Sequence, residues 1–448
     1  MAASPGPRRV GVVALGCRVG RSDAESLLAG LGPGYAAAAP GERADWVVVS
    51  ACTVTVDAAS ATRQAIRRAA RENPQARIVV AGCHAPGEAG ALGALPGVAA
   101  VVGAPAHAAL PSLVERLDAG EEPGSALRRA LASSPRWTAA PRGGAGPARP
   151  VLKVQDGCDH RCSYCAVWAA RGPSRSLPIG DALARLRALG ALRPEVVLAG
   201  VHLGAYGRDL HPATSLDALV REAASRGAAR RLRLSSVDPL ELPLALLSSE
   251  EGGVLCRHLH LPLQSGSDAV LGAMRRQPRS RDCARAVEAA ARAWPRACIG
   301  ADLIAGFPGE TEEDHLRTVD LVRSLPLAYL HVFPFSPRPG TPASRRTGRV
   351  PPGEVDRRAA ELRAISRGRW HAFLASLAGR EVEAVVEQVT EAGGEGTSSE
   401  FAPVRFAADG LARGDLVRVR VERIAEDGCE GAVSGVPFRA PRPPGVAA

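Results

Sequence analysis

The sequence has no long hydrophobic run. None of its 448 residues lies in a stretch of the roughly eighteen consecutive apolar residues that predict a membrane-spanning helix. The first residues, Met1 to Arg9, are few and polar, and they lack the apolar segment of a secretory signal peptide. We therefore expect a cytoplasmic protein with no membrane partner.

Aromatic residues are scarce, at 4% of the chain, and much of the 46% hydrophobic content is alanine, which buries little surface per residue. The length still allows about two to four domains with cores of their own. Ten cysteines in such a chain lack the density of a secreted disulfide scaffold. Metal ligation in a reducing compartment explains them better.

The charge is strongly positive: the formal net charge is +10 and the pI is about 9.5. An excess of basic residues favours a polyanionic partner, most simply nucleic acid. A general richness in arginine is the alternative explanation.

Three cysteines, Cys158, Cys162 and Cys165, lie in the stretch DGCDHRCSYC, residues 156–165, just after a short apolar strand at 151–155. This spacing lets one loop bring three thiolates to one face of an iron–sulfur cube and leaves the fourth iron open. Zinc is the alternative, with His160 as a further ligand, but zinc sites favour paired CxxC units.

The stretch resembles the radical S-adenosylmethionine (SAM) signature, CxxxCxΦC, in which Φ is aromatic and is Tyr164 here. The resemblance implies that the open iron binds the amino and carboxylate groups of SAM, and that the ring of Tyr164 lies near the adenine. One electron from the cluster then cleaves SAM to a 5′-deoxyadenosyl radical. The resemblance implies no residue that acts as a general acid or base.

The first third of the chain alternates strands and helices, with strands expected at 8–17, 45–51 and 77–81. This order predicts a doubly wound parallel sheet. Ser22, with Glu25 three residues later, predicts the capping box of the first helix. Cys17, Cys52 and Cys83 each follow a strand, so they are expected to converge at the carboxyl edge of the sheet as a second cluster site. Each cysteine alone would be read as a buried core residue.

This part is similar to the N-terminal domain of the methylthiotransferase family in three motifs: LGCRV at 15–19, CTVT at 52–55 and AGC at 81–83. In that family the three cysteines hold an auxiliary 4Fe–4S cluster. Gly20 and Ser50-Ala51 replace the family's usual Asn and Asn-Thr, which puts hydrogen bonding around that cluster in doubt. Trp168-Ala169 and Gln277-Pro278 are further departures.

The rest of the chain predicts three more regions. Residues 119–149 are rich in Ala, Pro, Gly and Arg and predict a linker. Six strand–helix units then predict a partial (β/α)6 barrel. A long helix at about 353–377 follows.

The period-two segments at 381–387 and 416–422 predict a small β-barrel, similar to the RNA-binding TRAM domain; a capping domain without an RNA-binding role is the alternative. The expected domains are 7–118, 119–149, 150–376 and 377–440. The expected barrel strands are 151–155, 195–201, 231–236, 257–261, 297–304 and 329–335, with helices near 178–191, 214–226, 239–248, 279–294 and 311–324.

The loops after these strands resemble the methylthiotransferase radical SAM domain, and the resemblance implies further contacts to SAM. His202 and His260 flank strands and are expected to be packed or hydrogen-bonded, not ligands. The other cysteines show no ligand spacing and are expected to be structural. The expected SAM contacts, besides Tyr164, are Gly200, Ser235, Gln264 and Asp302, and the structural cysteines are Cys256, Cys283, Cys298 and Cys429.

Taken together, the resemblance implies a methylthiotransferase with two 4Fe–4S clusters and SAM. The motifs GCRV and CTVT look most like the branch that acts on carbon 2 of N6-threonylcarbamoyladenosine at tRNA position 37, in the anticodon loop, where the base is already unpaired. Expected partners are tRNA and a flavodoxin or ferredoxin as electron donor, with no DNA. The alternatives are isopentenyladenosine in tRNA, a ribosomal-protein aspartate, another radical SAM reaction and a non-catalytic iron–sulfur RNA-binding protein.

Overall fold

The structure is a computed structural model that describes residues 6–39, 41–52, 55–84, 88–139 and 147–439. Thr53 and Val54 of the CTVT motif, and residues 140–146 of the expected linker, lie outside these ranges. The chain divides into two compact units, each described by itself. Unit 1 comprises 1–142, 156–174 and 336–344, and unit 2 comprises 143–155, 175–335 and 345–448.

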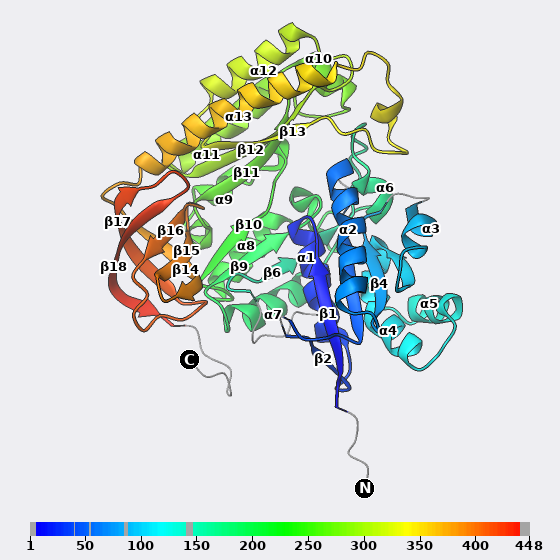
Figure 1. The fold of residues 1–448 in the computed structure, drawn as a ribbon. Helices are drawn as coiled ribbons and strands as arrows, with labels where there is room; N and C mark the ends of the chain where they lie inside the picture. Colours follow the sequence, from blue (N-terminus) through cyan, green and yellow to red (C-terminus); the bar gives the residue numbers. More distant parts are fainter. Residues whose placement is uncertain (1–5, 40, 53–54, 85–87, 140–146, 440–448) are drawn as a thin grey trace. The chain divides into compact units, whose positions relative to one another are not determined.

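Unit 1 is built on a five-stranded parallel sheet of order β2-β1-β3-β4-β5 (Figure 1). One face of the sheet forms a core with α1, α4 and α5, and the other forms a core with α2 and α3. The predicted doubly wound parallel sheet is therefore confirmed. Its elements are β1 (Arg8–Ala14), α1 (Arg18–Gly30), β2 (Tyr35–Ala37), β3 (Trp46–Ala51), α2 (Val56–Glu72), β4 (Arg77–Gly82), α3 (Glu88–Gly93), β5 (Val98–Gly103), η1 (Ala104–Ala109), α4 (Leu110–Asp118), α5 (Pro123–Ala132) and α6 (Val167–Arg171).

Three details of unit 1 were predicted wrongly. The first strand ends at Ala14, not Cys17, because Gly16 turns the chain before Cys17 starts the helix. The capping box at Ser22 is wrong as well, since Ser22 lies inside α1 and is buried. The expected linker contains α5, whose first turn is capped by the carboxylate of Glu122.

Unit 2 contains six parallel strands in two three-stranded sheets, ordered β10-β9-β6 and β11-β12-β13 (Figure 1). A parallel bridge from Leu232 to Leu255 joins β10 to the segment before β11. These strands confirm the predicted α/β class. Their elements are β6 (Val151–Lys153), β7 (Gln155–Asp156), β8 (Arg175–Ser176), α7 (Ile179–Gly190), β9 (Glu195–Ala199), η2 (Leu203–Ala205), α8 (Leu216–Ser225), β10 (Arg231–Leu234), η3 (Pro239–Glu241), α9 (Leu244–Leu247), η4 (Glu251–Val254), β11 (His258–Gln264), α10 (Asp268–Ala273), α11 (Ser280–Ala293), β12 (Cys298–Ala305), α12 (Glu312–Ser324), β13 (Tyr329–Pro334), η5 (Pro342–Arg345, mostly in unit 1) and α13 (Pro352–Ala375).

The helix expected at 239–248 is wrong: two short pieces, η3 and α9, replace it. Pro239 and Pro243 account for the break, because a proline inside a helix removes a backbone donor and clashes with the preceding turn. Among the described residues, no helix has both the length and the apolar character needed to cross a membrane.

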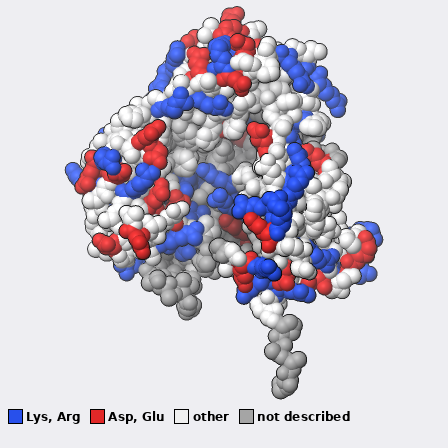
Figure 2. All heavy atoms as spheres, in the orientation of Figure 1, with Lys and Arg blue, Asp and Glu red and all other residues white. Residues whose placement is uncertain are grey.

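The C-terminal part of unit 2 is a closed barrel of order β14-β15-β16-β18-β17, as predicted. In β17 the apolar side chains Val417, Val419 and Val421 are buried while Arg418 and Arg420 are exposed, which confirms the period-two pattern. On the face seen in Figure 2, acidic and basic side chains are interspersed over the barrel instead of forming one basic patch. Its strands are β14 (Glu381–Thr390), β15 (Gly393–Ser398), β16 (Pro403–Phe406), β17 (Leu416–Ile424) and β18 (Cys429–Phe438).

A buried ion network joins this barrel to the parallel strands of unit 2. Glu195 is fully buried and lies 2.7 Å from Arg233 and 2.6 Å from Arg231. The two guanidiniums also donate to barrel carbonyls, at 2.8 Å for Ser398 and 2.9 Å for Glu383. Burial opposes the ionisation of Glu195, but the charges of Arg233 and Arg231 outweigh it and lower the pKa of its carboxyl group.

We expect Glu195→Gln to destabilise unit 2 by about 3–5 kcal/mol at pH 7, because it leaves two buried cations unbalanced. A carboxyl group with a lowered pKa in the folded state stabilises the fold above its unfolded pKa of about 4.3, and that contribution is lost as the pH falls below it. The difference between variant and native protein should therefore shrink in acid. Urea midpoints at a series of pH values test this, with the exposed Glu222→Gln as control; equal midpoints at pH 7 would refute it.

Candidate functional site

The Cys158 loop is held in shape by its own backbone. Gly157 has a φ of +73°, and a Cβ at this position would lie 1.9 Å from the carbonyl oxygen of Pro173. Only glycine therefore fits before the first cysteine. The amide of Cys158 donates to the carbonyl of Gly172 at 3.1 Å, which closes the base of the loop.

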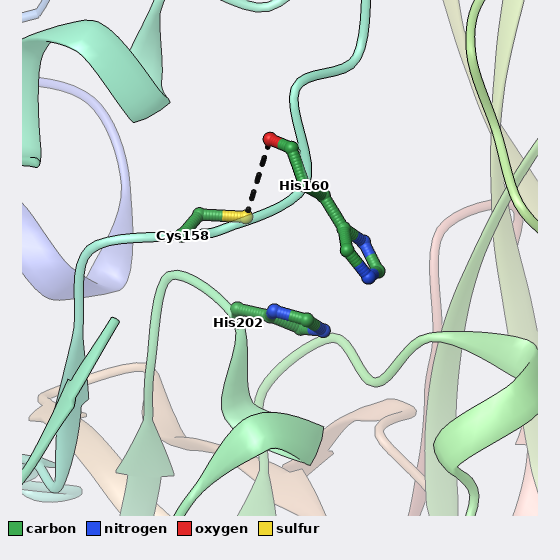
Figure 3. Close-up of side chains that lie close together, drawn as sticks. All are labelled: Cys158, His160 and His202. Atoms are coloured by element: carbon green, nitrogen blue, oxygen red, sulfur yellow. Dashed lines mark hydrogen bonds between the residues drawn. The ribbon is translucent and has the colours of Figure 1, made fainter. Parts of the chain in front are cut away.

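The sulfur of Cys158 donates to the backbone carbonyl of His160 at 3.7 Å (Figure 3). An imidazole nitrogen of His160 lies within 4.8 Å of the same sulfur. Burial raises the pKa of the Cys158 thiol to about 12, so the free site holds a neutral thiol at pH 7. A metal cluster that binds here as a thiolate complex must therefore displace a proton.

The second cysteine triplet lies at the carboxyl ends of strands in unit 1. Cys17 is the N-cap residue of α1, while Cys52 and Cys83 directly follow β3 and β4. Gly16 has a φ of +85°, and a Cβ there would lie 2.6 Å from the sulfur of Cys52. Besides burial, the charge of Cys17 contributes to the raised pKa of the Cys83 thiol, so these two side chains lie near each other; convergence of all three cysteines on one cluster stays a prediction.

Arg171, at the end of α6, connects the two cysteine segments within unit 1. Its Nε donates to the sulfur of Cys83 at 3.0 Å, and its NH1 donates to Asp156 at 2.9 Å and Asp23 at 3.1 Å. The guanidinium is 1% exposed and both carboxylates are fully buried. Burial raises the pKa of Cys83 to about 11, and the charge of Arg171 acts against this rise.

Arg171, Asp23 and Asp156 were not recognised in the sequence as site residues. Asp156 directly precedes the loop and Arg171 ends the short helix that follows it, which is the available signal. Their ion pairing depends on Asp23 from α1, more than a hundred residues away, and nothing local in the sequence reveals that contact.

Two departures from the family motifs touch each other in unit 1. The hydroxyl of Ser50 donates to the carbonyl of Gly20 at 3.3 Å, and a Cβ on Gly20 would lie 3.5 Å from that hydroxyl oxygen. The pair therefore forms a small, buried contact between β3 and α1 without any amide side chain. Trp168, another departure, lies under the guanidinium of Arg161, 5.7 Å from its centre.

The predicted SAM contacts in unit 2 lie at or near strand ends. The amide of Gly200 donates to the hydroxyl of Ser235 at 3.4 Å, so these two residues are brought together. Gln264 ends β11 with a φ of +71°, and Asp302 lies on β12. Tyr164 belongs to unit 1 and is half-buried. Contact of these five residues with SAM stays a prediction.

The histidines expected to be hydrogen-bonded are so. His202 pairs with Glu241 at 2.7 Å, and His260 pairs with Asp302 at 2.8 Å. The cysteines expected to be structural are all buried, namely Cys256, Cys283, Cys298 and Cys429.

Two protein families match the chain, each over the region that contains one of the two cysteine triplets. Residues 152–322 match the radical SAM superfamily, and residues 9–103 match the uncharacterized protein family UPF0004. The tRNA-2-methylthio-N(6)-dimethylallyladenosine synthase of Sphingopyxis alaskensis is 34% identical over 93% of this chain and 96% of its own length. The chain belongs to the radical SAM tRNA methylthiotransferase family. It is therefore an enzyme, and its family implies a 4Fe–4S cluster and SAM.

Two further relatives carry a different substrate in their names. The threonylcarbamoyladenosine tRNA methylthiotransferases MtaB of Thermotoga maritima and Bacillus subtilis are 30% and 31% identical, over 94% and 79% of this chain and 96% and 79% of their own lengths. Among solved structures, the radical SAM methyltransferase TsrM of Kitasatospora setae matches with a TM-score of 0.54 at 17% identity, covering 75% of each chain. That likeness supports the fold alone.

The residues present fit the cofactors of the family. Three cysteines in a glycine-bent loop form the donor set of a cluster with one open iron. The second triplet offers a second donor set of the same kind, with the guanidinium of Arg171 as a hydrogen-bond donor to one of its sulfurs.

Proposed function

We propose that this enzyme methylthiolates carbon 2 of N6-threonylcarbamoyladenosine at tRNA position 37, beside the anticodon, with SAM as both methyl donor and radical source. The observation that carries the proposal is the second cysteine triplet, because a radical SAM enzyme that only abstracts hydrogen has no need of it. An unpaired anticodon-loop base costs less to present to an enzyme than a paired one.

Each triplet has its own part in this proposal. Cys158, Cys162 and Cys165 would hold a 4Fe–4S cluster, and Tyr164 would contact the adenine of SAM. When bound, that cluster supplies the electron that cleaves SAM and produces the radical. The auxiliary cluster, which carries the sulfur to be transferred, is held by Cys17, Cys52 and Cys83.

The chain also shields and orients these ligands. Gly157 fixes the start of the first loop, and Gly16 leaves room for the sulfur of Cys52. Arg171 places a positive charge and an N–H donor against Cys83, which favours the thiolate form needed for ligation.

Two observations support the threonylcarbamoyl substrate. The motifs GCRV and CTVT resemble that branch, and two relatives with this activity in their names match the chain at 30% and 31% identity. Dimethylallyladenosine in tRNA is the second candidate, favoured by the relative at 34% identity.

A strain that lacks this gene provides the test. We expect its tRNA to lose the methylthio form of threonylcarbamoyladenosine. The threonylcarbamoyl precursor should accumulate, because the missing enzyme is the one that converts this precursor to the methylthio form. Mass spectrometry of digested tRNA measures both nucleosides. Loss of the methylthio dimethylallyl form instead would show the second candidate to be correct, and return of the lost nucleoside on re-expression is the control.

A further inference from the structure

Two histidines on parallel strands of unit 2 lie beside the same carboxylate oxygen of an aspartate on the strand between them. Oδ1 of Asp302, on β12, lies 2.8 Å from Nε2 of His260 on β11 and 3.4 Å from Nδ1 of His331 on β13. Asp302 and His331 are direct partners in the strand register. Burial opposes the ionisation of Asp302, but hydrogen bonds from His260 and His331 outweigh it and lower its pKa.

The group formed by His260, Asp302 and His331 is held by hydrogen bonds on its buried side and is exposed to solvent on the other. The hydroxyl of Tyr329 lies 2.9 Å from Nδ1 of His260, whose side chain is 7% exposed. Asp302 is 22% exposed and His331 53%. The exposed end of the cluster is therefore the imidazole of His331.

His331 lies on the open face of its strand. Its strand neighbours Leu330 and Val332 are buried, and both contact α13, through Ser366 and Arg363 respectively. Phe333, two residues after His331, is 41% exposed and its ring lies 6.5 Å from the imidazole. An exposed aromatic ring beside a polar group suits a nucleobase and its substituent.

Nδ1 of His331 lies 3.4 Å from Oδ1 of Asp302, so the carboxylate favours a proton on Nδ1 and thereby sets the state of the other nitrogen. In the neutral ring Nε2 accepts a hydrogen bond, and in the protonated ring it donates one. Nowhere in the described ranges does a partner for Nε2 occur. In the free protein water satisfies it, because His331 is 53% exposed, so a substrate that displaces this water must offer a polar group in its place.

We propose that His331, oriented by Asp302, is the contact that recognises the threonylcarbamoyl group on the substrate adenine; this rests on the proposed function. That group carries ureido N–H groups, a hydroxyl and a carboxylate, so it offers Nε2 a donor or an acceptor. A dimethylallyl group offers neither, and it would leave the polar face unsatisfied. A site built to hydrogen-bond one substituent rejects an analogue without it by leaving its own polar atoms unpaired.

Kinetics of the reconstituted enzyme on tRNA carrying either nucleoside test the role of His331. We expect His331→Ala to raise the KM for threonylcarbamoyl-tRNA about tenfold or more with little change in kcat, the effect of losing one polar contact to substrate. His371→Ala, an exposed histidine on α13, is the matched control and should keep the native KM. An unchanged KM for His331→Ala would overturn the proposal.

Asp302 is a positioning residue in this account, and a conservative change separates that role from a merely structural one. Asp302→Asn keeps an oxygen that can accept from His331 and should raise the KM for threonylcarbamoyl-tRNA less than Asp302→Ala, which should raise it as His331→Ala does; because Asp302 is also an expected SAM contact, the KM for SAM is measured alongside. Equal KM values for the two variants would contradict the role.

The outcomes distinguish this inference from the proposed function. If the native enzyme does not modify threonylcarbamoyl-tRNA at all, the proposed function has failed. If the native enzyme modifies it and His331→Ala does so equally well, only the role of His331 has failed. The three ligand atoms also lie within 4.8 Å of one another, so metal analysis accompanies the kinetics: zinc bound stoichiometrically in native protein and lost in His331→Ala would overturn the substrate role.

Discussion

Replacing Cys17 with alanine is expected to abolish the methylthio product while SAM cleavage continues. Cys17 lies at the start of α1 and belongs to the second triplet, so under the proposed function its loss removes a ligand of the auxiliary cluster only. The loop of Cys158 keeps all three of its cysteines. Anaerobic assays that measure 5′-deoxyadenosine and methylthiolated nucleoside in the same reaction separate the two activities.

The matched control is Cys283→Ala, which removes a buried thiol on α11 outside both triplets. It should give both products at close to the native ratio. Retention of methylthio product by Cys17→Ala would refute the role of the second triplet in sulfur transfer, and loss of both activities would show that the triplets do not act separately.

Replacing Arg171 with methionine is expected to destabilise unit 1 by about 3–5 kcal/mol, because it leaves Asp23 and Asp156 as buried carboxylates without their cation. Cys83 also loses the N–H donor that Nε of Arg171 provides at 3.0 Å. We expect a lower thermal midpoint and a weaker hold on the auxiliary cluster, seen as faster loss of iron to a chelator.

Arg161→Met is the control for this change, since Arg161 lies in the cysteine loop that precedes α6 but is exposed, with its guanidinium over the ring of Trp168. It should keep the native midpoint. Arg171→Lys keeps the charge but not the planar fork that reaches three partners, so an intermediate midpoint is expected. A native midpoint for Arg171→Met would mean that the buried ion cluster contributes nothing to stability.

The sequence predicted those parts of the fold that follow from local patterns. The run Trp46–Ala51 is apolar except for Ser50 and forms a strand that is buried along its whole length. Alternation of valine with arginine and glutamate in 416–422 likewise predicted a barrel strand. The cysteines at strand ends were recognised as a group because parallel strands bring their carboxyl ends to one edge.

The errors and omissions arise where the structure depends on contacts distant in sequence. Ser22 reads as a helix cap, but α1 begins four residues earlier because Gly16 turns the chain. Arg171 is basic and would be expected at the surface, yet two aspartates make its burial possible. The pairing of Asp302 with His331 depends on the register between β12 and β13, which no local pattern fixes.

The central claim is that one chain carries two clusters, one on each cysteine triplet. Anaerobic reconstitution with iron and sulfide, followed by iron analysis and Mössbauer spectroscopy, tests it most directly. We predict about eight irons per chain, present as two 4Fe–4S units. About four irons per chain, with the spectrum of a single cluster, would contradict it.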